Sequence, residues 1–239
     1  QVNLWGASYG TRLALGVMRD YPQGIRSVVL DSVYPPEVDM YLETPANLDR
    51  SMTLLFDSCI ADPVCNSAYP DLRKVFFDTV GYLDQNPVNL VVTNTLNGKS
   101  YNMLFTGDAL FGLVFQLLYQ TEILPYLPQL IYDASRGEFE VIGRIYGALL
   151  SLSSISSRGM TFSVQCNEEI PFSTLEQYDE ALLDYPDLAP YLRKSIVGEI
   201  GYHMCTFWTS GQADDRENEP VMSDIPTLIL QGEFDPITP

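Results

Sequence analysis

The sequence has 239 residues, of which 46% are hydrophobic, and a formal net charge of −18 at pH 7. This length allows one large domain or a core with a cap. The acidic charge argues against nucleic acid, whose phosphates it would repel, and the apolar runs are too short or too interrupted to form a membrane span. The same charge attracts cationic ligands such as a free peptide N-terminus, although it also simply favours solubility.

The chain begins with a predicted buried strand at residues 2–5, which runs into a Gly-x-Ser-x-Gly motif at Gly6–Gly10. Apolar residues at helical spacing follow over Thr11–Tyr21. This order of elements holds Ser8 in a strained turn, and we expect both flanking glycines to be required because side chains there would clash. The serine hydroxyl would lie beside the free N–H groups of the helix. The motif therefore predicts a nucleophile, with an ordinary glycine-rich turn as the alternative.

A second core strand is predicted at Ser27–Asp31, and a mostly helical insertion follows from residue 37 to about residue 224. The predicted helices of this insertion are Ala46–Ile60, Asp71–Asp84, Gly107–Tyr119, Ile123–Ser135, Phe139–Leu150, Thr174–Asp184 and Leu188–Glu199. We therefore expect core segments at residues 1–36 and 225–239 and a mainly helical cap at 37–224.

Two shorter features interrupt the helical pattern. Leu90–Thr93 and Tyr101–Leu104 suggest a small hairpin around Asn97 and Gly98. The serine-rich stretch at residues 151–157 is typical of a flexible connection.

A last apolar run, opened by Pro226 and closed by Gly232, is typical of a buried parallel strand. Asp235 follows in the loop at the carboxyl end of this strand, the edge at which the active-site loops of doubly wound α/β sheets gather. An Asp-Pro pair alone would indicate a turn. Downstream of Ser8, however, the order serine then aspartate is that of an α/β-hydrolase, in which the histidine comes last.

Three stretches resemble the prolyl iminopeptidase and tripeptidyl aminopeptidase group of α/β-hydrolases, a family of serine peptidases. They are Gly6–Arg12, Val164–Glu168 and Gly232–Pro239, and the last is the most specific because it is similar to the tripeptidyl aminopeptidase branch. The resemblance implies a partial α/β-hydrolase core with a mostly parallel sheet and a large helical cap. It implies no cofactor.

The resemblance also assigns roles to individual residues. Ser8 is the expected nucleophile, Asp235 the acid that orients a histidine, and the backbone N–H of Tyr9 one oxyanion donor. The family's histidine lies after the acid and its glycine-rich loop lies before the elbow, and neither is present in this sequence. We therefore expect a fragment that is a poor catalyst alone. His203, the only histidine, precedes the acid, and we expect it to be a packed structural group.

The four cysteines predict two disulfides, Cys59–Cys65 across a short turn-rich loop and Cys166–Cys205 between two distant parts of the cap. They would contribute about 2 and about 4 kcal/mol in the chain-entropy model. Two disulfides predict an oxidising compartment and thus a secreted or otherwise extracytoplasmic protein. Buried free thiols are an alternative. A metal site is disfavoured because only one histidine and no C-x-x-C pair are present.

Glu168 and Glu169 are the candidates to bind the ammonium group of a peptide substrate, with exposed acids at a helix start as the alternative. The sequence thus predicts a serine exopeptidase that releases N-terminal residues or tripeptides through an acyl-enzyme. An esterase or lipase uses the same machinery, and a non-catalytic binding module is the third possibility. The oligomeric state and the number of residues released are left open.

Overall fold

A computed structural model describes residues 1–153 and 157–239 of the chain. It divides into two compact units, the first formed by residues 1–51 with 159–239 and the second by residues 52–158. The serine-rich stretch predicted to be a flexible connection falls partly outside the described residues, at 154–156.

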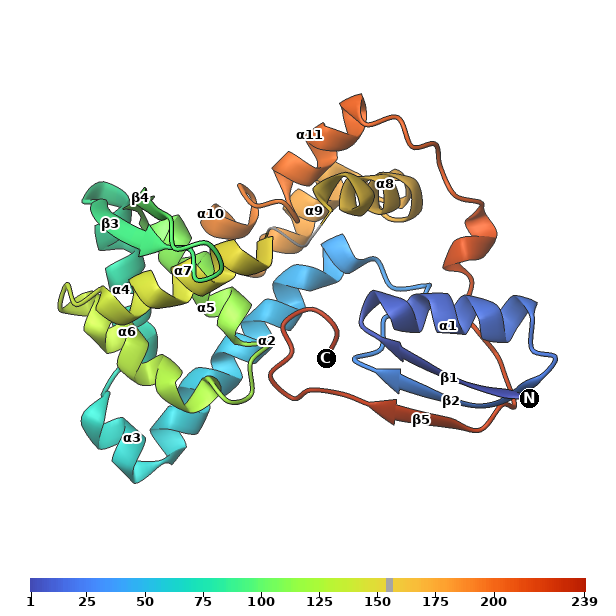
Figure 1. The fold of residues 1–239 in the computed structure, drawn as a ribbon, viewed down its shortest axis with the longest axis horizontal. Helices are drawn as coiled ribbons and strands as arrows, with labels where there is room; N and C mark the ends of the chain where they lie inside the picture. The colour runs from blue at the N-terminus through green and yellow to red at the C-terminus, as the bar shows by residue number, and fades with distance from the viewer. Residues whose placement is uncertain (154–156) are drawn as a thin grey trace. The chain divides into compact units, whose positions relative to one another are not determined.

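The first unit contains a three-stranded parallel sheet with one helix packed on it (Figure 1). Its elements are β1 (Val2–Ala7), α1 (Tyr9–Asp20), β2 (Ile25–Asp31) and β5 (Thr227–Leu230), with β2 in the centre of the sheet. Ala14 and Met18 of α1 are buried against Val28 and Leu30 of β2. This confirms the prediction of a partial α/β-hydrolase core with a parallel sheet.

The strand β5 is exposed, so the prediction that it is buried is wrong for the described chain. Leu228 is 55% exposed, Ile229 57% and Leu230 44%. The cause is its place at one edge of the sheet, where it pairs with β2, whereas α1 packs mainly against β1 and β2. The apolar sequence therefore identified the strand correctly but not its burial.

The rest of the first unit is helical. Its helices are the first part of α2 (Met40–Ala61), α8 (Arg158–Glu168), η2 (Ile170–Phe172), α9 (Leu175–Leu182), α10 (Ala189–Leu192), α11 (Glu199–Phe207) and η3 (Asp215–Asn218). The ring of Tyr202 packs against those of Tyr41 and Tyr178, with centroids 5.5 and 6.0 Å apart. The helix α2 starts earlier than predicted because the side chain of Asp39 accepts hydrogen bonds from the N–H groups of Tyr41 and Leu42.

The single helix predicted at Leu188–Glu199 is wrong, because the chain ends α10 at Leu192 and turns before α11. Gly198 makes this turn possible. A Cβ atom there would lie 2.3 Å from the Leu192 carbonyl oxygen and 2.7 Å from that of Arg193. The apolar residues keep a helical spacing on both sides of this turn, so the pattern alone predicted one helix, whereas Gly198 marks the break between two.

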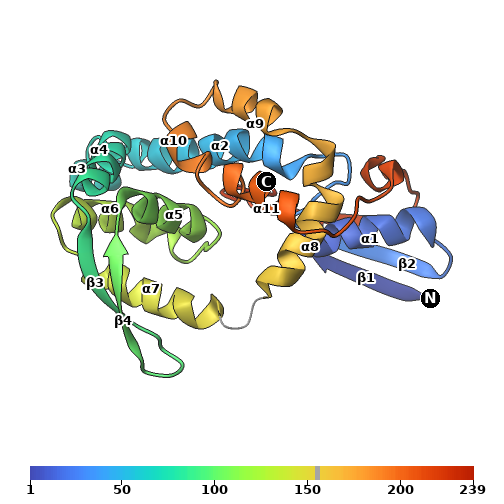
Figure 2. The ribbon, with the colours of Figure 1, turned by 90° about the horizontal axis from the view of Figure 1, so that it is seen from above.

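The second unit consists of helices and a two-stranded antiparallel hairpin, which lies beside α7 (Figure 2). Its elements after α2 are α3 (Pro63–Ala68), α4 (Leu72–Gln85), β3 (Val88–Thr93), β4 (Ser100–Phe105), α5 (Gly107–Leu117), η1 (Leu124–Tyr126), α6 (Leu127–Ser135) and α7 (Glu140–Ser153). Phe76, Phe105 and Val114 are fully buried in this unit. The predicted hairpin is confirmed, although its loop is longer than the Asn97-Gly98 pair alone.

Both predicted disulfides are present. Cys59–Cys65 joins Cα atoms 5.1 Å apart within the second unit, and Cys166–Cys205 joins Cα atoms 5.2 Å apart within the first. The second bond ties α8 to α11 across 39 residues of sequence.

Replacing both Cys166 and Cys205 with serine is expected to lower the unfolding free energy of the first unit by about 4 kcal/mol, because the bond closes the longer loop. Trp5 and Trp208, the two tryptophans, both lie in this unit, so tryptophan fluorescence during urea unfolding reports its transition. The matched double variant at Cys59 and Cys65, followed by far-ultraviolet circular dichroism, should lower the unfolding free energy of the second unit by only about 2 kcal/mol, because that bond closes a shorter loop. An equal shift for both pairs would contradict the loop-length argument.

Candidate active site

Ser8 lies between β1 and α1 in a backbone conformation that serine rarely adopts. Its φ is 52° and its ψ is −125°. Such a conformation costs about 1–3 kcal/mol and persists only where the surroundings enforce it. Here the backbone N–H of Ser8 donates a hydrogen bond to the Asp31 carbonyl (2.9 Å). The Thr11 hydroxyl donates to the Ser8 carbonyl (2.6 Å) and accepts a hydrogen bond from the Tyr34 N–H (2.8 Å). The predicted strained strand–turn–helix is therefore present.

The two glycines of the motif differ in what they contribute. A Cβ atom at Gly6 would lie 2.3 Å from the carbonyl oxygen of Gly10 and 2.9 Å from the backbone nitrogen of Thr11. A Cβ atom at Gly10 would meet nothing within 4 Å. The expectation that both glycines are sterically required thus holds for Gly6 and is wrong for Gly10, whose position faces open space.

Gly6→Ala is expected to destabilise the first unit by about 3 kcal/mol, because two backbone segments would have to move apart. Gly10→Ala is the matched control and is expected to be neutral or slightly stabilising, since alanine favours a helix over glycine. Urea unfolding followed by tryptophan fluorescence compares the two. Equal stability of both variants would show that the turn relaxes around a side chain at Gly6.

The carboxylate of Asp235 is fixed by its own loop. Its Oδ1 accepts hydrogen bonds from the backbone N–H groups of Ile237 (2.9 Å) and Thr238 (3.0 Å), and its Oδ2 accepts one from the Thr238 hydroxyl (3.0 Å). The residue is 9% exposed. Both oxygens are thus oriented, and Oδ2, which accepts one hydrogen bond in this structure, is the atom with capacity for another donor.

One face of α2 holds this loop in place. Arg50 donates to the backbone carbonyl oxygens of Glu233 (2.5 Å) and Asp235 (2.8 Å). Ser51 donates to the carbonyl oxygen of Phe234 (2.5 Å), and Asn47 donates to that of Ile237 (3.1 Å). Sequence reasoning missed these contacts. The signal was present in the spacing of Asn47, Arg50 and Ser51, which places three polar side chains on one face of the helix.

A cavity of about 340 Å³ in the first unit brings the elbow, the acid loop and α8 together. It is lined by Ser8, Tyr9, Tyr34, Met40, Met160, Thr161, Val164, Gln165, Glu169, Ile237 and Thr238. Ser8 therefore faces the same space as the two residues whose N–H groups hold the Asp235 carboxylate.

Glu169 contributes a buried carboxylate to this cavity. It is 5% exposed, and burial raises its pKa to about 7. Glu168 is less buried and accepts a hydrogen bond from the Tyr9 hydroxyl (2.7 Å). Glu168 is the last residue of α8, and Glu169 precedes the short helix η2 but is buried, so the alternative of two exposed acids at a helix start is wrong.

Several buried polar atoms around the cavity lack a hydrogen-bond partner within the described chain. Among them are the Tyr34 hydroxyl, Oε1 of Gln165 and Oε1 of Glu169, all from residues that line the cavity. Unsatisfied buried polar atoms are rare in folded proteins because each costs free energy. Two of the three are pure acceptors, so a ligand that brings N–H donors would satisfy them.

His203 lies elsewhere, on α11. Its side chain is 63% exposed, and its Nε2 is 3.3 Å from the Glu199 carboxylate one turn earlier. The expectation that it is a packed structural group is therefore wrong. It borders a separate surface hollow with Lys194 and Phe207, and it is not among the residues that line the cavity of Ser8.

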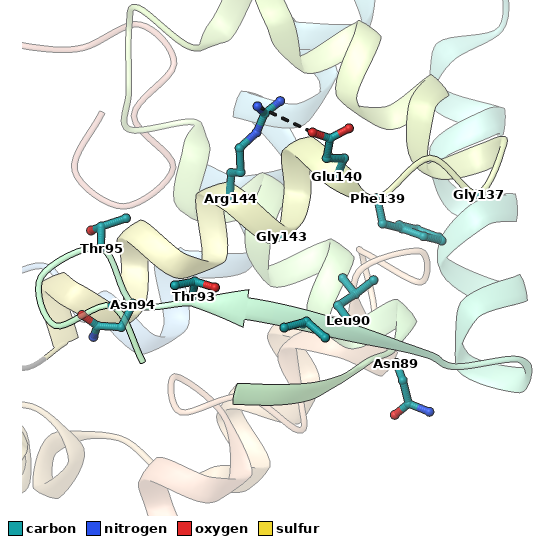
Figure 3. Close-up of a pocket in the computed structure, with 12 residues that line it drawn as sticks. Asn89, Leu90, Thr93, Asn94, Thr95, Gly137, Phe139, Glu140, Gly143 and Arg144 are labelled. Carbon is teal, nitrogen blue, oxygen red and sulfur yellow. Dashed lines mark ion pairs between the residues drawn. The ribbon is translucent and has the colours of Figure 1, made fainter. Parts of the chain in front are cut away.

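A larger hollow, of about 800 Å³, lies in the second unit between the β3–β4 hairpin and α7 (Figure 3). Arg144 and Glu140 form an ion pair at 3.8 Å on its rim, with side chains 70% and 86% exposed. Such solvated charges contribute little. The smaller cavity is the candidate site because it combines a strained serine, a buried carboxylate and unsatisfied acceptors.

A strained serine between a parallel strand and a helix, with an acid loop after a later strand, defines the α/β-hydrolase arrangement. Residues 196–239, which include β5 and Asp235, match the model of a family described as TAP-like protein. Serine protease Hip1 of Mycobacterium bovis and of two strains of Mycobacterium tuberculosis is 22% identical over 252 residues, covering 98% of this chain and 46% of the relative. The chain thus spans about half the length of these curated relatives. Together the findings support an α/β-hydrolase of the TAP-like serine peptidase type.

Proposed function

We propose that the protein is a serine exopeptidase that cleaves peptides near a free N-terminus through an acyl-enzyme. Ser8 attacks the scissile carbonyl, and the backbone N–H of Tyr9, at the first position of α1, donates to the oxyanion. Asp235 orients the imidazole of a histidine through Oδ2. The strained elbow and the fixed carboxylate support these roles.

One observation carries the choice of an aminopeptidase. The cavity that contains Ser8 also contains a buried carboxylate, Glu169, whose Oε1 lacks a hydrogen-bond partner, and the unsatisfied amide oxygen of Gln165. A peptide ammonium group brings three N–H donors and a positive charge, so it satisfies both acceptors and the buried carboxylate at once. The neighbouring Glu168 adds a second negative charge close to Glu169. A substrate held there presents a carbonyl near its own N-terminus to Ser8.

The histidine that completes the triad comes, in this proposal, from polypeptide outside these 239 residues. The support is the position of His203, which is exposed and pairs with Glu199 rather than lining the cavity. The relatives, about twice as long, leave room for such a residue.

The two disulfides support an extracytoplasmic location for the protein, since such bonds persist in oxidising compartments. No helix among the described residues has the length and apolar character of a membrane span.

The proposal is tested with alanyl and trialanyl p-nitroanilides, their N-acetylated counterparts and a short-chain ester, using the whole gene product. We expect kcat/KM to be about 100-fold higher for the free amines, because acetylation removes a charge and charge-assisted hydrogen bonds. The ratio between the two free amines shows whether one residue or three are released. Equal cleavage of acetylated substrates would overturn the N-terminal preference, and turnover of the ester alone would favour an esterase.

The 239-residue chain by itself is expected to turn over these amides at least about 1,000-fold more slowly than the whole gene product, because the serine then lacks its general base. The same assays on both forms measure this. Comparable amide turnover would show that His203, or another group of this chain, acts as the base.

A further inference from the structure

Arg12 is a buried cation beside the cavity. It lies on the first turn of α1, four residues after Ser8, and is 5% exposed. Its guanidinium donates to the Pro36 carbonyl (3.0 Å) and to Oδ1 of Asn218 (2.7 Å), and it lies 5.1 Å from the centre of the Tyr34 ring. These contacts fix the planar group in one orientation.

The same guanidinium carries the positive charge next to both acids. Its Nη2 lies 3.4 Å from Oε1 of Glu169, and its Nε lies 3.8 Å from Oε2 of Glu168. The hydrogen bonds of Arg12 nevertheless go to Pro36 and Asn218, and Oε1 of Glu169 is left without a hydrogen-bond partner. Arg12 therefore compensates the charge of Glu169 without occupying its acceptor.

We propose that Arg12 is a positioning residue that keeps Glu169 ionised and its Oε1 open to the ammonium group of the substrate. Arg12 then determines how strongly the enzyme prefers free N-termini to blocked ones. This inference rests on the proposed function of the cavity, and it assigns Arg12 a part that neither the elbow nor the triad requires.

The electrostatics around Glu169 give the direction of the effect. Burial raises the pKa of this carboxyl to about 7, and the Arg12 charge opposes the rise. Asp39 and Glu168 act in the same direction as burial, while the phenol of Tyr34 favours the carboxylate. Tyr41 also lies close enough to be affected by the charge of Glu169. Without Arg12 the pKa of Glu169 therefore rises further, and at pH 7 the carboxyl is mostly protonated and a poor partner for an ammonium group.

The test compares Arg12→Met, which retains an unbranched apolar side chain, with Arg12→Lys, which retains the charge. The readout is the ratio of kcat/KM for trialanyl p-nitroanilide to that for its N-acetylated form, measured from pH 5.5 to 8.5. We expect Arg12→Met to lower the ratio at least about fivefold at pH 7, which is the loss of ionised Glu169 when its pKa rises by about one unit from about 7. The ratio should recover as the pH rises, until the substrate amine itself loses its proton. Arg12→Lys should restore at least part of the ratio.

Arg19→Met is the matched control, because Arg19 lies on the same helix with an 11% exposed side chain but pairs with Asp20 and Glu217. A purely structural role of Arg12 predicts equal losses on both substrates, an unchanged ratio and no shift of its pH dependence, and that result would overturn the inference. If Arg12→Met does not fold, Arg12→Gln, which removes the charge but keeps a polar side chain, takes its place, and a wild-type ratio and pH dependence in that variant would also overturn the inference.

A double-variant cycle shows whether Arg12 acts through Glu169. In a Glu169→Gln background, Arg12→Met should change neither the ratio nor its pH dependence, because the titrating partner is gone. An undiminished effect in that background would contradict the inference. Failure of the proposed function is distinct, since the wild-type enzyme would then show no preference for the free amine at any pH.

Discussion

Ser8→Ala is expected to lower kcat on peptide amides about a millionfold, the loss found when the nucleophile of a serine peptidase is removed. The variant should also lose covalent labelling by a fluorophosphonate, which requires an activated serine hydroxyl. The physical reason is that the strained turn presents this hydroxyl at the end of β1, beside the N–H of Tyr9. Alanine fits the same backbone, so the fold should be retained.

Ser32→Ala is the matched control for this variant. Ser32 also has a positive φ, of 57°, and follows β2, but it is not among the residues that line the cavity. Ser32→Ala should leave both the fluorophosphonate labelling and the peptidase turnover unchanged. Unchanged peptidase activity in Ser8→Ala would instead remove the assignment of the nucleophile.

Asp235→Asn is expected to lower kcat about 10,000-fold, as replacement of the buried acid does in serine peptidase triads. Asparagine can keep Oδ1 as the acceptor for the N–H groups of Ile237 and Thr238, so the loop should retain its shape. Its amide nitrogen would then take the place of Oδ2. A donor there cannot accept the N–H of an imidazole, and the histidine would adopt the wrong tautomer.

Steady-state kinetics on the free-amine amide and on a short ester measure this loss, with circular dichroism to confirm the fold. Glu233→Gln is the control, because Glu233 is an exposed acid of the same loop whose backbone carbonyl, not its side chain, is held by Arg50. A loss of less than about tenfold in Asp235→Asn would be too small for the orienting acid of a triad and would place that acid elsewhere.

The sequence predicts the parts of the site that depend on local chemistry. A positive φ at Ser8 and a close approach at Gly6 are properties of a few adjacent residues, and the Gly-x-Ser-x-Gly motif encodes both. Asp235 likewise follows from a short apolar strand and an Asp-Pro turn. These features could be recognised without knowledge of distant contacts.

The contacts between distant segments could not be predicted in this way. Arg12 meets Asn218 across 206 residues of sequence, and Arg50 meets Asp235 across 185. No local pattern specifies such pairs, because they depend on how the helices of the first unit pack. The burial of Glu169 is another case, since its sequence neighbours suggested an exposed helix start.

The errors have the same origin. The apolar sequence of β5 predicts burial, but burial depends on what covers the strand. The aromatic and sulfur-containing neighbours of His203 suggested a packed environment, whereas the helix α11 turns this side chain to solvent. Gly10 fits the motif, yet a Cβ atom added there would meet nothing within 4 Å.

The most direct test of the account is to trap and map the acyl-enzyme. The whole gene product is mixed with a trialanyl ester, quenched in acid within the first turnover, and analysed by peptide mass mapping. The account predicts an acyl group on the peptide that contains Ser8, with a free amino end. Full turnover with no adduct, or an adduct on another residue, would contradict it.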